Sequence, residues 1–165
     1  MKIIVDKSIA DLGKKSIVIA IAKNVNPAAK LSDAFLEKQK KMEEWALNCD
    51  AEEAAKHPVN QGYIDSISAV GRSTKKNPPT AVALIQNIKR RGSIPNINSI
   101  VDIYNVESLH SFLAIGGHDF DKIEEEICFT VSKKEDIFYP ILAPEKYVAE
   151  TDYVYKDKKG IMAWI

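Results

Sequence analysis

Cysteines are scarce in this chain of 165 residues. Only Cys49 and Cys128 are present, and neither belongs to a Cys-x-x-Cys pair. Structural zinc sites are built from closely spaced thiolates, so this spacing excludes a zinc knuckle. We expect both residues to be buried free thiols of a cytosolic protein rather than partners in a disulfide.

An excess of charge of either sign is also missing, because 23 Lys+Arg residues balance 23 Asp+Glu residues. No global field therefore attracts nucleic acid, and any contact with RNA must come from a local patch. The apolar run "IVIAIA" at 17–22 is too short to cross a membrane. The first residues hold no long apolar run either, so we expect a cytoplasmic protein without a membrane segment.

What is present is an ordinary globular balance, with 45% hydrophobic and 28% charged residues. The length suits one domain over 1–165. Apolar and β-branched runs come first, helical patterns follow, and strand patterns return at the end, which predicts an α+β fold. Strands are expected at 2–5 and 16–24, and hairpins at 126–143 and 152–165.

Helical patterns fill the middle of the chain. The stretch 31–48 is amphipathic, and its apolar stripe is expected to pack in the core; the stripe holds Leu31, Ala34, Phe35, Met42, Trp45 and Ala46. Two short helices are expected over 51–71, with a break at Pro58 and Gly71 at the end. Asn77 and Pro78 predict the start of a helix that runs to Arg91.

Polar groups are densest in "NINSIVDIYNVESLHSFLAIGGHDFDKI", residues 96–123. Asn98 is a good N-cap for a helix that apolar residues cover almost all round, so a buried helix is expected. Asp102, Asn105 and Ser108 recur at every third position and share one side. Buried polar groups need hydrogen bonds, so these residues either hold loops or line a pocket. The helix dipole favours the structural role for Asp102, whereas both roles stay open for Asn105.

Familiar site chemistry is not matched in this stretch. His118, Asp119 and Asp121 lack the alternating oxygen ligands and closing glutamate of a calcium loop. "IGGHD" lacks the Lys-Ser/Thr of a phosphate loop, and no Gly-x-Ser-x-Gly elbow is present. We therefore expect no metal and no cofactor. His118 is open to two interpretations, as a general base or as a structural residue.

The order of several segments is similar to one protein family. "KKNPPTAVALIQNI" leads to "RRGSIPNINSIVDIYNVESL", then to "IGGHDFDKIEEEI" and a strand ending in "FYPI". This pattern, from about Ile17 onward, resembles the B3/B4 tRNA-binding and editing domain of the phenylalanyl-tRNA synthetase beta subunit, in its free-standing version. The resemblance implies an α+β fold with β-sandwich-like sheets of unusual topology and helices packed on them. No aminoacylation motif of a synthetase is visible.

The resemblance also implies a site. Asn105 matches the family's editing asparagine, while the family's histidine falls at Gly116, two positions before His118. We take Asn105 and His118 as the catalytic candidates. The candidates for substrate binding lie on the same helix and the following turn: Asn98, Asp102, Tyr104, Ser108, Gly116, Gly117 and Asp119. The family's discriminating glycine and glutamate would follow "GIMAWI", where this sequence ends, so a domain shortened relative to the family is expected.

Three functions are compatible with these observations. The first is binding of tRNA or mischarged aminoacyl-tRNA; if the chain is an enzyme, it is then an aminoacyl-tRNA deacylase that acts by orientation and hydrogen bonding. Its phosphate contacts would come from a basic cluster that can equally be a solvated helix end: Lys75, Lys76, Lys89, Arg90 and Arg91. The second is binding of a free amino acid, and the third is an inactive partner-binding domain.

Overall fold

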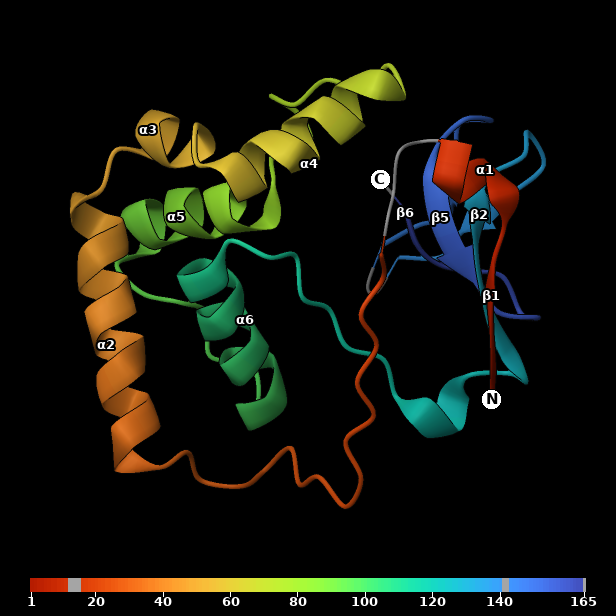
Figure 1. Ribbon diagram of the computed structural model, residues 1–165. Helices are drawn as coiled ribbons and strands as arrows, with labels where there is room; N and C mark the ends of the chain where they lie inside the picture. Colours follow the sequence, from red (N-terminus) through yellow and green to blue (C-terminus); the bar gives the residue numbers. More distant parts are fainter. Residues whose placement is uncertain (12–15, 141–142, 165) are drawn as a thin grey trace. The chain divides into compact units, whose positions relative to one another are not determined.

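A computed structural model of the protein describes residues 1–11, 16–140 and 143–164 (Figure 1). The chain divides into two compact units. Unit 1 comprises Met1–Ile21, Ser66–Arg72 and His118–Ile165, and unit 2 comprises Ala22–Asp65 and Ser73–Gly117. Helices and a mixed sheet occur together, so the α+β class is confirmed. The assignment of the whole chain to one domain stays a prediction.

Unit 1 contains the sheet. Its described strands are β1 (Lys2–Val5), β2 (Glu126–Val131), β3 (Ile137–Phe138), β4 (Lys146–Tyr147), β5 (Tyr153–Lys156) and β6 (Ile161–Trp164). They lie in the order β1-β2-β5-β6-β3-β4, with β1 parallel to β2 and β3 parallel to β6. The remaining pairs are antiparallel. All the described strands belong to this one sheet, which refines the expectation of sandwich-like sheets.

Alternation along β2 explains how the sheet buries one face. Ile127 and Phe129 are buried and pack with Ile9 of helix α1 (Lys7–Asp11), while the alternating residues Glu126, Cys128 and Thr130 are half-buried. Tyr155 and Met162, from β5 and β6, pack against the same cluster. The side chains that surround the end of the sheet near His118 are therefore fixed by a packed core.

Two strand predictions were wrong. Residues 16–24 contain no described strand, and the side chain of Val18 is 92% exposed. High β propensity is insufficient where no neighbouring strand supplies hydrogen bonds and burial. The 126–143 hairpin is also absent, because β2 pairs with β1 and β5 while β3 pairs with β4 and β6. The 152–165 hairpin is confirmed, and Asp157 accepts hydrogen bonds in its turn from the N–H groups of Lys159 and Gly160.

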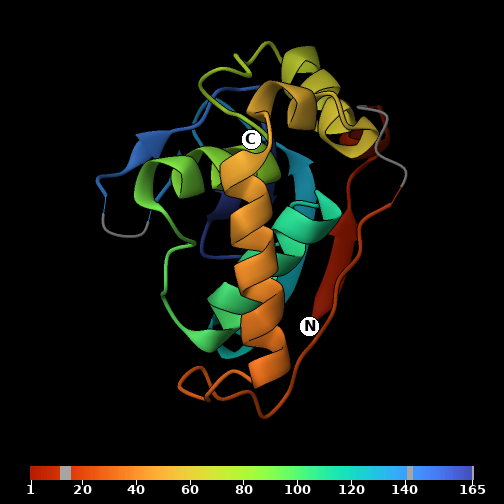
Figure 2. The ribbon, with the colours of Figure 1, turned by 90° about the vertical axis from the view of Figure 1, so that its left-hand side faces the viewer.

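Unit 2 is helical. It contains α2 (Asp33–Asn48), α3 (Ala51–Ala55), α5 (Thr80–Arg91), α6 (Ser99–Ser111) and the first part of α4 (Pro58–Ala69). Helix α2 lies against α5 and α6 (Figure 2). The core between the helices is apolar and includes Ala46, Leu84, Ile85, Ile88, Val106 and Leu109.

Local signals placed most helix ends correctly. Gly71 and Gly92 have positive φ angles after α4 and α5, and Asn98 caps α6. Helix α2 begins at Asp33, two residues after the predicted start, and Ser32 is its N-cap. The start of α5 was wrong. Its N-cap position is Pro79, and Asn77 instead donates its side-chain amide to the Ser73 carbonyl.

Two predictions of burial in unit 2 were also wrong. Phe35, Met42 and Ala46 of the α2 stripe join the core, but Trp45 is 38% exposed. Helix α6 is buried on one face only, and Ile103 on another face is exposed. When the apolar stripe of a helix is wider than the surface that neighbouring helices cover, the apolar residues at the edges of the stripe stay exposed to solvent.

Candidate functional site

The first turn of α6 is held by its own polar side chains. Asn98 Oδ1 accepts hydrogen bonds from the N–H groups of Ile100 at 3.1 Å and Val101 at 3.0 Å. These two groups lack partners inside the helix, which is why an asparagine stabilises this end. Asp102 is buried, and its Oδ1 accepts from the Ile97 N–H at 3.0 Å. Both side chains thus have structural contacts, and their proposed contact with substrate stays a prediction.

The turn after α6 is tied back onto the helix. The buried Ser108 Oγ accepts from the Ile115 N–H at 3.2 Å, and the Tyr63 hydroxyl accepts from the Ala114 N–H at 3.0 Å. The Tyr104 ring lies beside Gly117, where an added Cβ would come within 3.3 Å of a ring carbon. Three of the predicted substrate residues, Tyr104, Ser108 and Gly117, therefore hold one turn in place. Gly116 is exposed in that turn.

Asn105 differs from its neighbours on α6. It is half-buried, and its side chain forms no hydrogen bond to any residue that the structure describes. A polar amide without a protein partner is available to a ligand or to water. Of the polar residues that the sequence singled out on this helix, Asn105 is the one not engaged in holding the backbone.

A separate pocket lies in unit 1, which we call the His118 pocket. It has a volume of 380 Å³, and its lining is His118, Asp119, Lys122, Ile123, Phe138, Tyr139, Asp157, Lys159, Gly160, Ile161 and Met162. His118 Nε2 lies 2.7 Å from the Tyr155 hydroxyl, and the two rings meet edge to face. Asp119 caps the short helix η1 (Phe120–Lys122) by accepting from the Asp121 N–H. The structure thus brings His118 and Asp119 together, whereas Asn105 belongs to unit 2.

The electrostatics of this pocket favour a neutral histidine. His118 is an exposed residue, but partial burial of its ring lowers its pKa below the ordinary value of 6.5, although the negative charge of Asp157 acts in the opposite direction. Burial raises the pKa of Tyr155, so its hydroxyl keeps its proton. A neutral imidazole beside a protonated phenol can accept one proton and pass on another.

Asp157 supplies a fixed negative charge. Burial alone would raise its pKa, but hydrogen bonds from three backbone N–H groups and the charge of Lys159 lower it. The N–H of Glu124 lies 3.0 Å from Oδ2 of Asp157. The carboxylate therefore stays ionised, and Lys122 and Lys159 place positive charge in the same lining. The pocket offers both signs of charge to a bound molecule.

The chemistry available here is positioning and proton transfer. The described lining contains no serine, threonine or cysteine, so it supplies no hydroxyl or thiol nucleophile of those types. Among the residues that the structure describes, no group of three or more His, Cys, Asp or Glu side chains could hold a metal ion. Attack by a water molecule is the reaction that such a site can support.

The basic cluster is exposed but partly engaged. Lys89 Nζ donates to the Leu47 carbonyl at 3.0 Å, and Arg90 donates to Asn87 at 2.5 Å. Lys75, Lys76 and Arg91 are exposed. These contacts support the interpretation of Lys89 and Arg90 as a helix end, and they leave the remaining charges open to solvent.

Tyr155 and Asp157 are among the residues of the His118 pocket region that sequence reasoning missed, as are Lys122 and Lys159. The alternation in "DYVYKD" predicts that Tyr155 points to one face of a strand, but not which segment lies opposite. His118 and Tyr155 are 37 positions apart, and only the sheet brings them together.

Comparison with known proteins places the chain in a family. A sequence model described as "B3/4 domain" matches residues 64–165, which is more than half of the chain. No curated protein and no solved structure gives a significant match. Within the described residues, no helix is both long and apolar enough to cross a membrane. The chain belongs to the B3/4 domain family, which is associated with the beta subunit of phenylalanyl-tRNA synthetase.

Proposed function

We propose that this protein binds tRNA and hydrolyses the ester of mischarged aminoacyl-tRNA, with the His118 pocket receiving the amino acid. The observation that carries the proposal is the family match over residues 64–165, which includes all of α6 and every residue that lines the pocket. The pocket volume of 380 Å³ lies within the usual range for small-molecule sites, about 300–1,000 Å³.

The reaction needs no covalent intermediate with the protein. Neutral His118 accepts a proton from a water molecule, and the resulting hydroxide attacks the ester carbonyl. The bond between the acyl carbon and the ribose oxygen breaks, the ribose oxygen takes up the proton that His118 accepted from water, and a free amino acid and uncharged tRNA leave. Tyr155 orients the imidazole through the 2.7 Å contact. The resemblance makes Asn105, which belongs to unit 2, the other catalytic candidate.

A deacylation assay with a panel of mischarged tRNAs tests this proposal. We expect His118→Ala to lower the rate by about 10²–10⁴-fold, the usual contribution of a general base. Asn105→Ala is also expected to abolish activity. His110→Ala is the matched control, because His110 is exposed on α6 and lies outside the pocket. Full activity in both test variants would show that the site assignment is wrong.

RNA binding has its own test. Affinity for tRNA should fall steeply with salt, because neutralised phosphates release counterions. Alanine at Lys89, Arg90 and Arg91 should weaken binding and reduce the salt dependence. If neither higher salt nor the three alanine substitutions weakened tRNA binding, the basic cluster would have no role in it.

A second candidate is binding of a free amino acid. This candidate is favoured by the two signs of charge in the pocket lining. A free amino acid carries both charges, so its carboxylate would pair with Lys122 and its ammonium group with Asp157. Calorimetry with the twenty amino acids, beside a binding assay with labelled tRNA, separates the two functions. Amino-acid binding without tRNA binding would support the second.

A further inference from the structure

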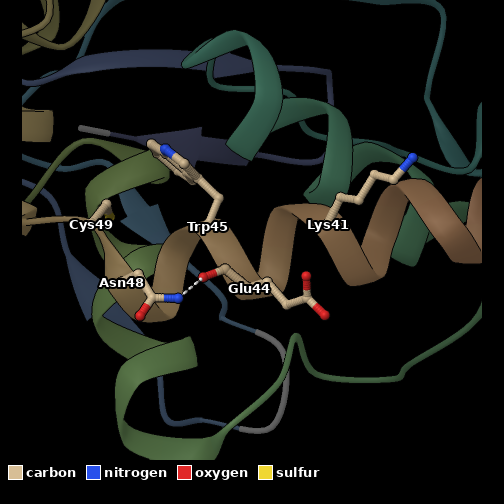
Figure 3. A pocket seen from close by; sticks show the side chains of 5 residues that line it. All are labelled: Lys41, Glu44, Trp45, Asn48 and Cys49. Atoms are coloured by element: carbon tan, nitrogen blue, oxygen red, sulfur yellow. Dashed lines mark hydrogen bonds between the residues drawn. The ribbon is translucent and has the colours of Figure 1, made fainter.

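A second surface pocket lies on α2, outside the part of the chain that matches the family. It has a volume of 410 Å³ and is lined by Lys41, Glu44, Trp45, Asn48 and Cys49 (Figure 3). Lys41 and Trp45 lie on one ridge of the helix and Glu44 and Asn48 on the neighbouring ridge, with a groove between them, and Cys49 follows as the C-cap of α2. We call this groove the Trp45 groove.

The indole of Trp45 is exposed and held in place. Its ring meets Phe112 edge to face with 5.8 Å between ring centroids, and Phe112 stacks in turn on His57 at 4.3 Å. These contacts restrict the rotamers of the indole while 38% of the residue stays exposed. Binding to such a ring costs little side-chain entropy, because the ring is already ordered. The other tryptophan, Trp164, is half-buried and packs against Phe138.

Polar side chains also line the groove. Lys41 lies one helical turn before Trp45, about 6 Å along the axis. Figure 3 shows both side chains rising from the same side of α2. The Asn48 amide donates to the Glu44 carbonyl at 2.7 Å, which fixes the amide and leaves its oxygen free to accept. The Glu44 carboxylate is a second acceptor in the same groove.

From this arrangement we infer that the Trp45 groove binds an unpaired nucleobase of RNA. The base stacks on the indole, as bases do on aromatic platforms of single-strand binding proteins. Lys41 contacts the adjacent phosphate, one turn away. Glu44 and Asn48 accept hydrogen bonds from an exocyclic amine, which cytosine and adenine carry and uracil lacks. The inference rests on the proposed function, and it assigns α2 a contact with a single-stranded part of the tRNA.

Two short RNAs provide the sharpest probe, an octamer of cytidine and an octamer of uridine. They have the same backbone and charge, and both bases are pyrimidines, but only cytosine has the amine. In a Trp164→Phe background, the fluorescence of Trp45 should be quenched by the cytidine octamer. The wild-type groove should bind cytidine more tightly than uridine, and Glu44→Leu should remove that preference. Equal affinity for both octamers in wild type would contradict the role of Glu44 and Asn48.

Substitution of the aromatic ring tests the stacking itself. Trp45→Leu should weaken binding of the cytidine octamer and of tRNA by about 5- to 150-fold, the range found for loss of one base–aromatic stack. Trp45→Phe should retain part of the affinity. Lys41→Ala should weaken binding, whereas Lys40→Ala should not, because Lys40 has the same charge but lies outside the groove. Equal losses for both lysines would show a general effect of charge and overturn the inference.

The outcomes separate this inference from the proposed function. If tRNA binds to wild type and Trp45→Leu alike, the groove is not an RNA site, and the proposed function stands. If the octamer binds through Trp45 but no mischarged tRNA is deacylated, the groove is supported as an RNA-binding site and the proposed hydrolytic function is wrong. If neither RNA binds, both are overturned.

Discussion

Removing the positive charge of Arg72 should destabilise unit 1 strongly. The Asp152 side chain is fully buried, with 0% exposed, and it accepts two hydrogen bonds from the Arg72 guanidinium, one of them at 2.7 Å. Arg72 also lies over the Trp164 ring, 6.0 Å from its centroid. Substitution with methionine keeps an apolar chain over that ring but leaves the carboxylate without its cation.

The magnitude follows from the burial of the two partners. Loss of one partner of a buried ion pair costs about 3–5 kcal/mol, because an uncompensated charge stays inside. Here 33% of the Arg72 side chain is exposed, and Asp152 retains a hydrogen bond from the Ala149 N–H at 3.2 Å. We therefore expect Arg72→Met to lower the free energy of unfolding by about 2–3 kcal/mol.

Urea unfolding measures this effect. In a Trp45→Phe background, Trp164 is the remaining tryptophan and reports on unit 1. The double variant Arg72→Met with Asp152→Asn should recover part of the loss, because the buried negative charge is then gone. A change below about 0.5 kcal/mol for Arg72→Met, as at ordinary surface positions, would refute the reasoning. So would a double variant no more stable than the single one.

Two further perturbations test the polar contacts of the candidate sites. Ser108→Ala should lower stability by about 1 kcal/mol and speed amide hydrogen exchange at Ile115, because the Ile115 N–H loses its acceptor; unchanged exchange there would contradict the contact. The lowered pKa of His118 means that the unfolded chain binds this proton at higher pH than the folded chain does, so stability should decline as pH falls below about 6.5. An NMR titration should place the midpoint of His118 below 6.5, and His118→Asn should flatten the decline; a midpoint above 6.5 would show that burial does not dominate.

Helix ends and the last hairpin could be predicted because their signals are local. Asn98 caps α6 through N–H groups two and three residues away, and Gly92 ends α5 with a left-handed conformation of its own backbone. The 157–160 turn closes through the Asp157 side chain within three residues. Interactions over so few positions depend little on the rest of the fold.

Burial was harder to predict. The apolar pattern at 16–24 has the composition of a strand, yet the chain there has no described strand partner. Trp45 lies on the apolar stripe of α2, but the helices beside α2 cover only part of that stripe. Which apolar residues are covered depends on neighbours from distant segments, so hydrophobicity along the chain was not enough.

In the candidate site, too, local features could be predicted from the sequence and contacts between distant segments could not. Asn105 and His118 were identified from the order of residues in one segment, and the family match includes both. The partners of His118 could not be identified from the sequence, because Tyr155 and Asp157 come from a hairpin more than thirty residues away. Polar spacing on α6 could not show which backbone groups Asp102 and Ser108 contact; the structure shows that they accept hydrogen bonds from the N–H groups of Ile97 and Ile115, and their contact with a substrate stays a prediction.

The sequence by itself was therefore enough to predict the α+β class and most helix ends, and its resemblance to a known domain indicated the family. The folded structure was needed to reveal the order of strands, the His118–Tyr155 contact, the buried Asp152 with its arginine, and the exposure of Trp45. The physical reason is that caps and turns gain their hydrogen bonds within a few residues. Strand pairing, burial and pKa shifts depend instead on which distant segments the fold brings into contact.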